Sequence, residues 1–576
     1  MNGSPGPREW CAVAAIAFLQ LTLLVGIAAR VGVTVDEPSH LLSSRLYWSG
    51  EDKLAPRDMP PLLKIFAGAV ASRFEIPIPR DHASWKKQNE WEIALEMMER
   101  MNRAQIEQVF FWARLPMTFF PVACALLLWW WARQLFSWPA AVAAQAILAL
   151  SPTALGHGAL VKNDMAAAFG YLLFWYAAWR WWRSPEWKHA AMVGIGLAAA
   201  MLAKMSMLIL PPIAVLGVLL RARSLGVKRA IATLALVLLI PYISALAGWQ
   251  FEVRRLGRAD IEICRQDAHL PSWACDVGTV FQAVPLPQPL WDGFLGLLRS
   301  NDVPPGVYFL GSTQTRGLPA YFVVALLVKL TEFALLLFFA GAATLLWRLW
   351  RRRLDASCVF WTVPAFLYIG LASGANLQLG VRLVLPALPF LVLIGTYALD
   401  FAAPRLRTFL CAAIILLAAV KAVQVFPNGI SYFNAFAGGP DNGIAWLSDS
   451  NLDWGQSLRD LRHEVTDRRI KFLRVCYFGT DNLWAYFTDR EVEQITPPWN
   501  AAFAQGPHYQ PQPGWYAISA THVTGQLFPR EYRDYFQVFR TLRPVAKAGY
   551  SIFLYEIPDP ATTRDRPVES SSQVVR

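Results

Sequence analysis

Hydrophobic residues occur along this chain in long runs that are separated by shorter polar stretches. A helix of about twenty apolar residues is long enough to cross the hydrocarbon core of a bilayer. We expect eleven such helices and therefore an α-helical polytopic membrane protein. The expected spans are residues 10–31, 108–131, 138–152, 164–180, 188–203, 206–221, 229–248, 319–347, 357–373, 380–400 and 406–426.

The composition agrees with a membrane protein. The chain has 576 residues, of which 55% are hydrophobic and 16% are charged, whereas about a quarter of the residues in a soluble domain are charged. The first apolar run has the position of a cleavable signal peptide. It lacks a small-x-small cleavage site before the polar stretch that follows, so we expect it to be retained as the first span.

Basic residues predict the orientation of the spans. They gather in alternate short loops, and loops rich in Lys and Arg face the cytoplasm. This placement puts the N-terminus inside and the C-terminus outside, and it assigns the net charge of +12 to membrane topology rather than to nucleic-acid binding. The residues concerned are Arg133; Arg180, Arg183 and Lys188; Arg221, Arg223, Lys228 and Arg229; Arg348, Arg351, Arg352 and Arg353; and Arg405 and Arg407.

Two cysteines, Cys264 and Cys275, share one of the segments that this orientation places outside the cell. An oxidising compartment permits a disulfide between them, but the sequence leaves open whether the two thiols pair. The three outer segments expected are residues 33–105, 249–318 and 427–576.

The chain divides into a membrane module, residues 1–426, and an outer part. Residues 427–558 are long enough to form a small domain. Strands expected over residues 472–478, 515–519 and 551–557 alternate there with helical or loop stretches, which predicts a compact α/β unit. Residues 559–576 are rich in Pro, Ser and Arg without an apolar pattern, and we expect a disordered tail.

Several charged and polar residues lie next to spans on the predicted outer side. Ionisable groups at membrane depth are costly, and they usually line a cavity or pair with one another. Four separate outer connections contribute such groups, which indicates a site. The residues are Asp36 and Glu37; His157, Lys162 and Asp164; Lys204; and Asn376, Gln378 and Arg382.

Each of these residues taken alone also has an ordinary structural explanation. Either acid of the first loop could cap a helix or lie solvated, and Asp164 could cap the span that it begins. Lys204 and Arg382 could extend to the lipid headgroups, and His157 could be a packing histidine. The prediction of a site therefore depends on the convergence of these residues on one side.

A carboxylate opposite several cations suits group transfer from a lipid-linked phosphate. The carboxylate can act as general base toward an attacking hydroxyl, and the cations can bind the phosphate and stabilise its charge as it leaves. A position in the membrane fits a phosphate that carries a lipid tail. The sequence has no Walker A stretch and no glycine fingerprint for a soluble nucleotide.

Short motifs in the chain resemble those of the GT-C membrane glycosyltransferases, and most closely the protein O-mannosyltransferase and aminoarabinose transferase group (glycosyltransferase family 39 and its bacterial relatives). The acidic first-loop motif corresponds to residues 35–40. A stretch similar to His-Pro-Pro-Leu-x-Lys begins with Met59 in place of the His, so any role of that imidazole is lost. The stretches that carry the resemblance further are residues 59–64, 150–165, 380–390 and 432–456.

The resemblance implies an inverting transferase that uses a polyprenyl-phosphate sugar. Asp36 would then be the general base, and Glu37 and Asp164 would shape the pocket for the acceptor or the sugar. The candidates for binding the lipid phosphate are Lys64, Lys204 and Arg382, and His157 is a further candidate for substrate binding.

The outer segment at residues 427–456 suits sugar recognition. Asn451 and Asp453 could bind hydroxyl groups, and Trp454 could stack on a pyranose. Tight turns that lead the chain into the outer domain would also be rich in Gly and Asn, so the sequence leaves both explanations open.

No Cys/His spacing resembles a metal site. Although the acids of the first loop and of the fourth span could hold a divalent ion, we expect neither a metal nor another cofactor.

We therefore expect an integral membrane glycosyltransferase that transfers a sugar from a polyprenyl-phosphate donor to an extracytoplasmic acceptor, such as a protein hydroxyl, a lipid or an envelope glycan. Its expected place is the cell (inner) membrane, with the active site facing the periplasm or the exterior. The alternative is a transporter or flippase of a lipid-linked glycan. That class would need polar groups on both sides of the membrane and helices in paired halves.

Overall fold

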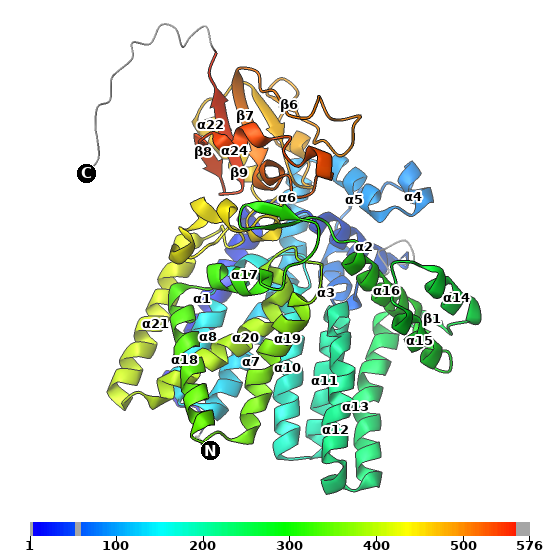
Figure 1. The fold of residues 1–576 in the computed structure, drawn as a ribbon, viewed down its shortest axis with the longest axis vertical. Coiled ribbons are helices and arrows are strands. Elements are labelled where there is room, and N and C mark those ends of the chain that lie inside the picture. Colours follow the sequence, from blue (N-terminus) through cyan, green and yellow to red (C-terminus); the bar gives the residue numbers. More distant parts are fainter. Residues whose placement is uncertain (1–3, 52–58, 560–576) are drawn as a thin grey trace.

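The computed structural model describes residues 4–51 and 59–559. Long helices lie side by side in a bundle, and a small sheet lies beyond one end of it (Figure 1). The bundle helices are α1 (Pro7–Arg30), α6 (Arg103–Arg114), α7 (Phe119–Leu135), α8 (Trp138–Ala149), α9 (Pro152–Gly158), α10 (Asp164–Arg183), α11 (Trp187–Ala203), α12 (Leu210–Leu225), α13 (Val227–Gly248), α18 (Glu332–Trp350), α19 (Val359–Ser373), α20 (Leu388–Tyr397) and α21 (Pro404–Val425).

The bundle has the lengths and composition of a membrane module. Within the described residues, eight helical segments are long and apolar enough to cross a membrane, and counting the bent pair α8–α9 as one span makes nine. The helices α10 and α11 run alongside them (Figure 1). The predicted class, an α-helical polytopic membrane protein, is confirmed, while the count of eleven spans stays a prediction.

The predicted span over residues 319–347 is wrong in one respect, because the chain forms two helices there. The first is α17 (Tyr321–Lys329), and Leu330 and Thr331 have extended backbone before α18 begins. Only α18 of this pair is long enough to cross a membrane. Lys329 is the last residue of α17, and its buried ammonium group bonds to backbone carbonyls outside the bundle helices.

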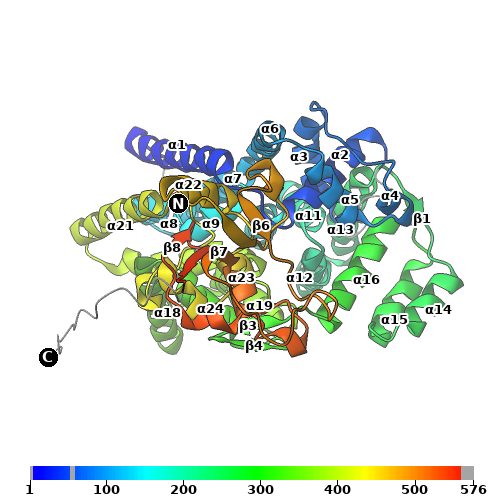
Figure 2. The same ribbon diagram turned by 90° about the horizontal axis from the view of Figure 1, so that it is seen from above.

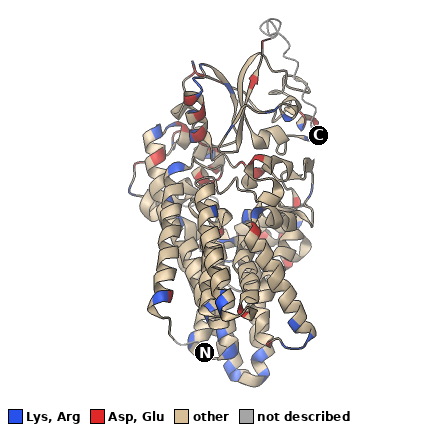
Figure 3. Ribbon diagram, turned by 90° about the vertical axis from the view of Figure 1, so that its left-hand side faces the viewer, with Lys and Arg blue, Asp and Glu red and all other residues tan. Residues whose placement is uncertain are grey.

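At the bundle end that is farther from the C-terminal sheet, Lys and Arg positions predominate over Asp and Glu positions (Figure 3). The turn between α12 and α13, with Arg223 and Lys228, belongs to this end, as does the start of α1 (Figure 1). This distribution has the asymmetry expected of a membrane protein. Which side of the membrane each end faces stays a prediction.

The first two outer segments fold into short elements around the other end of the bundle. Figure 2 shows α14 to α16 to one side of the sheet when the molecule is seen from above. The elements are α2 (Glu37–Ser49), α3 (Pro61–Ala71), α4 (Ala83–Lys87) and α5 (Glu90–Glu99), then β1 (Val253–Arg254), α14 (Arg258–Gln266), α15 (Ser272–Phe281), β2 (Leu286–Pro287), α16 (Gln288–Asp302), β3 (Val307–Phe309) and β4 (Ser312–Gln314).

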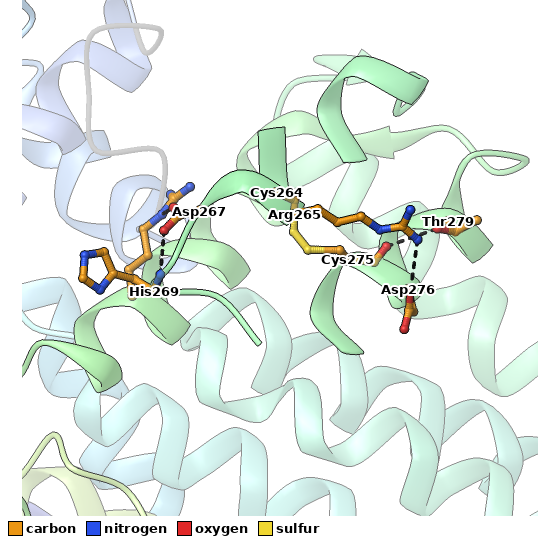
Figure 4. The surroundings of a disulfide bond; sticks show 8 residues. Cys264, Arg265, Asp267, His269, Cys275, Asp276 and Thr279 are labelled. Carbon is orange, nitrogen blue, oxygen red and sulfur yellow. Dashed lines mark hydrogen bonds and ion pairs between the residues drawn. A yellow bond between two sulfur atoms is a disulfide. The ribbon is translucent and has the colours of Figure 1, made fainter. Parts of the chain in front are cut away.

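Cys264 on α14 and Cys275 on α15 form a disulfide (Figure 4). Both cysteines are buried and pack in a small apolar cluster with Trp291 and Leu295 of α16. The structure thus pairs the two thiols whose state the sequence left open.

The C-terminal part forms a five-stranded sheet with the strand order β6-β5-β7-β9-β8. β5 pairs in parallel with β6 and β7, whereas β9 pairs antiparallel with β7 and β8. The three predicted strands are confirmed as β5, β7 and β9, within a mixed α/β unit. Its elements are α22 (Leu458–Asp467), β5 (Leu473–Cys476), β6 (Val492–Gln494), β7 (Gly514–Ser519), α23 (Ala520–Thr524), α24 (Gln537–Thr541), β8 (Ala546–Ala548) and β9 (Ile552–Ile557).

The segment 427–456 lies between the bundle and the sheet, and Lys329 fixes it. Lys329 Nζ donates to the backbone carbonyls of Ile430, Tyr432 and Asn451 at 2.7, 2.5 and 2.6 Å. Its ammonium group also lies 4.4 Å from the ring centroid of Phe433. A buried cation is stable only when such acceptors surround it, so this side chain holds the segment against the outer end of the bundle.

Candidate active site

Asp36 lies in the short loop that joins α1 to α2, at the outer end of the bundle. Its side chain is 25% exposed and forms an ion pair with Lys162. Arg382 Nη1 lies 3.7 Å from the same carboxylate oxygen, Oδ2. Burial raises the pKa of Asp36, but the charges of Lys162 and Arg382 outweigh burial and hold the pKa below its usual value. The carboxylate is therefore ionised and accessible at neutral pH.

His40, one turn into α2, orients Lys162. Its Nδ1 lies 2.8 Å from the carbonyl oxygen of Val161, which can only accept a hydrogen bond. Nδ1 must therefore carry the proton, and Nε2 presents a lone pair to Lys162 Nζ at 3.4 Å. The ammonium group is thus held between the imidazole of His40 and the carboxylate of Asp36.

A second acid, Asp164, begins α10, adds one more cation to the site and contacts Arg382 as well. Lys204 Nζ lies 2.5 Å from Asp164 Oδ1, and Arg382 Nη1 lies 4.0 Å from Asp164 Oδ2. Arg382 thereby stands between the two carboxylates. Three cations, Lys162, Lys204 and Arg382, face two carboxylates, which leaves this cluster with one positive charge in excess.

Trp454 covers the cations on one side. The guanidinium of Arg382 lies 4.5 Å and the ammonium of Lys162 lies 5.4 Å from the centroid of its ring. The indole is only 2% exposed, and His157 packs on it with ring centroids 5.8 Å apart. Cations are attracted to the face of an indole ring, so Trp454 here orients the cations. This arrangement does not provide the open stacking surface for a pyranose that the sequence suggested.

Asn451 and Asp453 make bonds that hold the backbone of the site. Asn451 Oδ1 accepts from the backbone N–H of Val381 at 2.9 Å, next to Arg382. Asp453 accepts from the backbone N–H groups of Gly455 at 3.2 Å and of Thr521 at 3.0 Å. Both side chains are buried, and their bonds favour the structural explanation left open at the sequence level.

Glu37 follows Asp36 in the chain but has different surroundings. Its carboxylate forms two bonds with Arg114, Nε to Oε1 at 2.8 Å and Nη2 to Oε2 at 2.6 Å. It also accepts from the backbone and hydroxyl of Thr34 and from the backbone N–H of Val161. Both charged side chains are fully buried. Five donors occupy this carboxylate, which favours a role of Glu37 in positioning the loop, while its expected part in shaping the pocket for the acceptor or the sugar stays a prediction.

Two further residues predicted for substrate binding, Lys64 and His157, are buried on α3 and α9. The part of Lys64 in binding the lipid phosphate stays a prediction. His157 is buried on α9 against Trp454, and within the described chain neither of its ring nitrogens has a hydrogen-bond partner.

The sequence had not predicted how two residues that organise this site, Lys162 and Arg114, pair with the acids of the first loop. Lys162 was noticed as a charged residue, but its pairing with Asp36 across 126 positions carries no local signal. Arg114 did have a signal, because it is an arginine inside an apolar run that was predicted to span the membrane. A buried guanidinium needs a buried acid as its partner, and this need could have linked Arg114 to the acids of the first loop.

The described residues contain no group of three or more His, Cys, Asp or Glu side chains placed to hold a metal ion. The expectation that neither a metal nor another cofactor takes part stays a prediction.

Residues 104–249 match the model of the PMT_2 family, described as dolichyl-phosphate-mannose-protein mannosyltransferase. The matched stretch contains Arg114, Lys162, Asp164 and Lys204 and is only part of the chain. It confirms the predicted resemblance to the GT-C membrane glycosyltransferases of the protein O-mannosyltransferase group. Together with the helical bundle, it supports a membrane enzyme of glycosyl transfer.

No curated protein sequence matches the chain. One similar solved structure is ArnT from Cupriavidus metallidurans bound to undecaprenyl phosphate, with 13% identity, a TM-score of 0.45, and coverage of 95% of this chain and 98% of that chain. Another is the oligosaccharyltransferase AglB from Archaeoglobus fulgidus in complex with an inhibitory peptide and a dolichol-phosphate, with 12% identity, a TM-score of 0.45, and coverage of 98% and 75%. At these identities and TM-scores, neither likeness decides the activity of this chain.

Removal of the Glu37 carboxylate should destabilise the fold. Glu37→Ala leaves the guanidinium of Arg114 buried without its counterion, and breaking a buried pair in this way costs about 3–5 kcal/mol of folding free energy. We expect a large fall in the midpoint of thermal unfolding of the detergent-solubilised protein. The exposed pair of Glu51 and Arg80 provides the control, because Glu51→Ala should cost less than about 1 kcal/mol. A Glu37→Ala protein as stable as the Glu51→Ala protein would contradict the positioning role.

Proposed function

We propose that this protein is an integral membrane glycosyltransferase that transfers a sugar from a polyprenyl-phosphate donor to a hydroxyl group on the outer side of the cell membrane. The observation that carries the proposal is the cluster of Lys162, Lys204 and Arg382 around Asp36 and Asp164 at one end of a membrane-spanning bundle. Cations gathered at that depth fit an anion that reaches the site from the bilayer.

The charge of the cluster fits a lipid phosphate. A phosphate diester that links a lipid to a sugar carries one negative charge, and three cations, Lys162, Lys204 and Arg382, outnumber the two carboxylates beside them, with Asp449 acting on Arg382 from farther away. Arg382 presents a planar fork of donors suited to phosphate oxygens, and Lys204 supplies a compact charge. The description of the matched family, dolichyl-phosphate-mannose-protein mannosyltransferase, names a sugar donor that is linked to a lipid phosphate.

Asp36 is suited to activate the acceptor. In the proposed step the acceptor hydroxyl oxygen attacks the anomeric carbon from the face opposite the phosphate. The hydroxyl proton passes to Asp36 Oδ, the new glycosidic bond forms, and the bond from the anomeric carbon to the phosphate oxygen breaks. The electron pair of the broken bond leaves with the phosphate, whose growing charge Lys204 and Arg382 stabilise. The anomeric configuration inverts, and Lys162 keeps Asp36 ionised before the attack.

The rival function is transport of a lipid-linked glycan across the membrane. A transporter needs polar groups that the substrate meets on its way from one side to the other. The charged cluster of this chain gathers at one end of the bundle, beside the C-terminal part. This one-sided arrangement supports an enzyme that meets its acceptor outside the membrane.

Asp36→Asn should abolish transfer. The amide has nearly the same shape as the carboxylate but cannot accept the proton, so we expect a fall in kcat of at least about a hundredfold with little change in donor binding. The measurement is sugar transfer by purified protein supplied with polyprenyl-phosphate sugars, together with the thermal unfolding midpoint as a control for folding. Transfer at the wild-type rate by the folded variant would exclude Asp36 as the base.

Arg382→Ala and Lys204→Ala should weaken donor binding. A charge-assisted hydrogen bond contributes about 1.5–3 kcal/mol, so we expect the KM for the lipid donor to rise by roughly tenfold or more in each variant. The control is Arg407→Ala, because Arg407 pairs with Asp400 beyond the far end of α20. If both site variants keep the donor KM of the Arg407→Ala protein, the phosphate binds elsewhere.

A further inference from the structure

The loop that carries Asp36 is held from its outer side by the C-terminal part of the chain. Residues 31–36 join α1 to α2 without regular secondary structure. On the bundle side, Arg114 donates to the carbonyls of Val31 and Gly32 at 2.8 Å. On the outer side, the loop meets two stretches that are more than 400 positions away in the sequence, residues 454–456 and 480–481.

Residues 454–456 pair with the loop through backbone hydrogen bonds. Gly32 N donates to Gln456 O at 2.8 Å, and Val35 N donates to Trp454 O at 2.9 Å. A Cβ atom on Gly32 would lie 2.7 Å from Gln456 O, which is closer than such atoms approach. Only glycine therefore permits this contact at the start of the loop.

Thr480 and Asp481, in the loop that follows β5, contact the remaining backbone groups. Thr480 Oγ1 donates to Val35 O at 2.8 Å, and a second carbonyl, Thr34 O, lies 3.3 Å away. Val33 N donates to Asp481 Oδ2 at 3.2 Å. The carbonyl of Val35 belongs to the peptide bond with Asp36, so the hydroxyl of Thr480 acts directly on the residue that carries the carboxylate.

The loop after β5 is itself firmly anchored. Asn482 Nδ2 donates to the backbone carbonyls of Met98, in the last turn of α5, at 3.1 Å and of Met101, between α5 and α6, at 3.3 Å. Its Oδ1 accepts from Trp484 N at 3.0 Å. Thr480, Asp481 and Asn482 are all at least nine-tenths buried. The C-terminal part thus presents a fixed surface to the Asp36 loop.

We propose that the C-terminal domain positions the Asp36 carboxylate through Thr480 and Asp481, which act as positioning residues for the transfer reaction. The inference rests on the proposed function and adds that the outer domain completes the catalytic geometry. The side-chain groups that face Asp36 are the ammonium of Lys162, the guanidinium of Arg382 and the imidazole of His40, with Asp449 acting at longer range. A shift of the loop would alter all of these contacts at once, and displacement of a catalytic group by about 1 Å can cost up to a hundredfold in rate.

A pair of substitutions at Thr480 separates positioning from folding. Thr480→Val keeps the shape of the side chain but removes the hydroxyl, whereas Thr480→Ser keeps the hydroxyl. We expect kcat to fall about tenfold in Thr480→Val, to recover in Thr480→Ser, and the donor KM to stay within about twofold of wild type. The control is Thr466→Val, because the hydroxyl of Thr466 donates to Arg462 O within α22, far along the chain from the Asp36 loop.

The pH dependence of kcat gives a readout that loss of folded protein would not change. Lys162 and Arg382 hold the pKa of Asp36 low, so a displaced carboxylate would become protonated at higher pH. The decline of kcat on the acid side should therefore begin at higher pH in Thr480→Val than in Thr480→Ser. A loss that is equal at every pH and follows the thermal unfolding midpoint would overturn the proposal.

Hydrogen–deuterium exchange tests the same contacts without an activity assay. The amides of Val33 and Val35 should exchange faster in Thr480→Val than in Thr466→Val or wild type. Unchanged exchange would overturn the proposal even if kcat falls. If Asp36→Asn keeps full activity, the assignment of the base fails, yet the exchange rates still report whether Thr480 holds the loop. The two failures are therefore distinguishable.

Discussion

The buried ion pair between Glu37 and Arg114 is the interaction on which the site depends. The guanidinium binds the carboxylate with two hydrogen bonds and donates its remaining N–H groups to the carbonyls of Ala28, Val31 and Gly32. It therefore satisfies the carbonyls at the C-terminal end of α1, where a helix has no partners of its own. The same carboxylate accepts from Val161 N, one residue before Lys162. One buried pair thus fixes the relative positions of the loop of Asp36 and the loop of Lys162.

The remaining charges at the outer end of the bundle follow from the low polarity of their surroundings. Each buried ion there needs a partner, and the pairs of Asp36 with Lys162 and of Asp164 with Lys204 leave Arg382 shared between the two acids. Trp454 and Ser450, both from the outer segment, hold that guanidinium in place. The charged groups of the site therefore come from the outer ends of the bundle helices and from the loops that join them, and the outer segment contacts Arg382 from above.

The sequence predicted the class of fold and part of the site. Apolar runs and basic loops are local signals, so most bundle helices could be located. The merging of α17 with α18 passed over a signal, because Lys329 is a charged residue inside the apolar run that was predicted to span the membrane. Asp36, Asp164, Lys204 and Arg382 were identified as charges on one side, and the structure brings them together. The pairing of Glu37 with Arg114 and the contact of Thr480 with Val35 join parts of the chain that are far apart in the sequence, so no local pattern reports which residues meet.

The fate of a lipid-linked sugar in reconstituted vesicles tests the central claim most directly. Purified protein would be incorporated into liposomes with a polyprenyl-phosphate sugar and an extracytoplasmic acceptor fraction, and the lipids and acceptor would be analysed by mass spectrometry. The account predicts that the acceptor gains the mass of one sugar and that sugar-free polyprenyl phosphate appears in equal amount. Movement of the intact sugar lipid from one leaflet to the other, without release of polyprenyl phosphate, would contradict it.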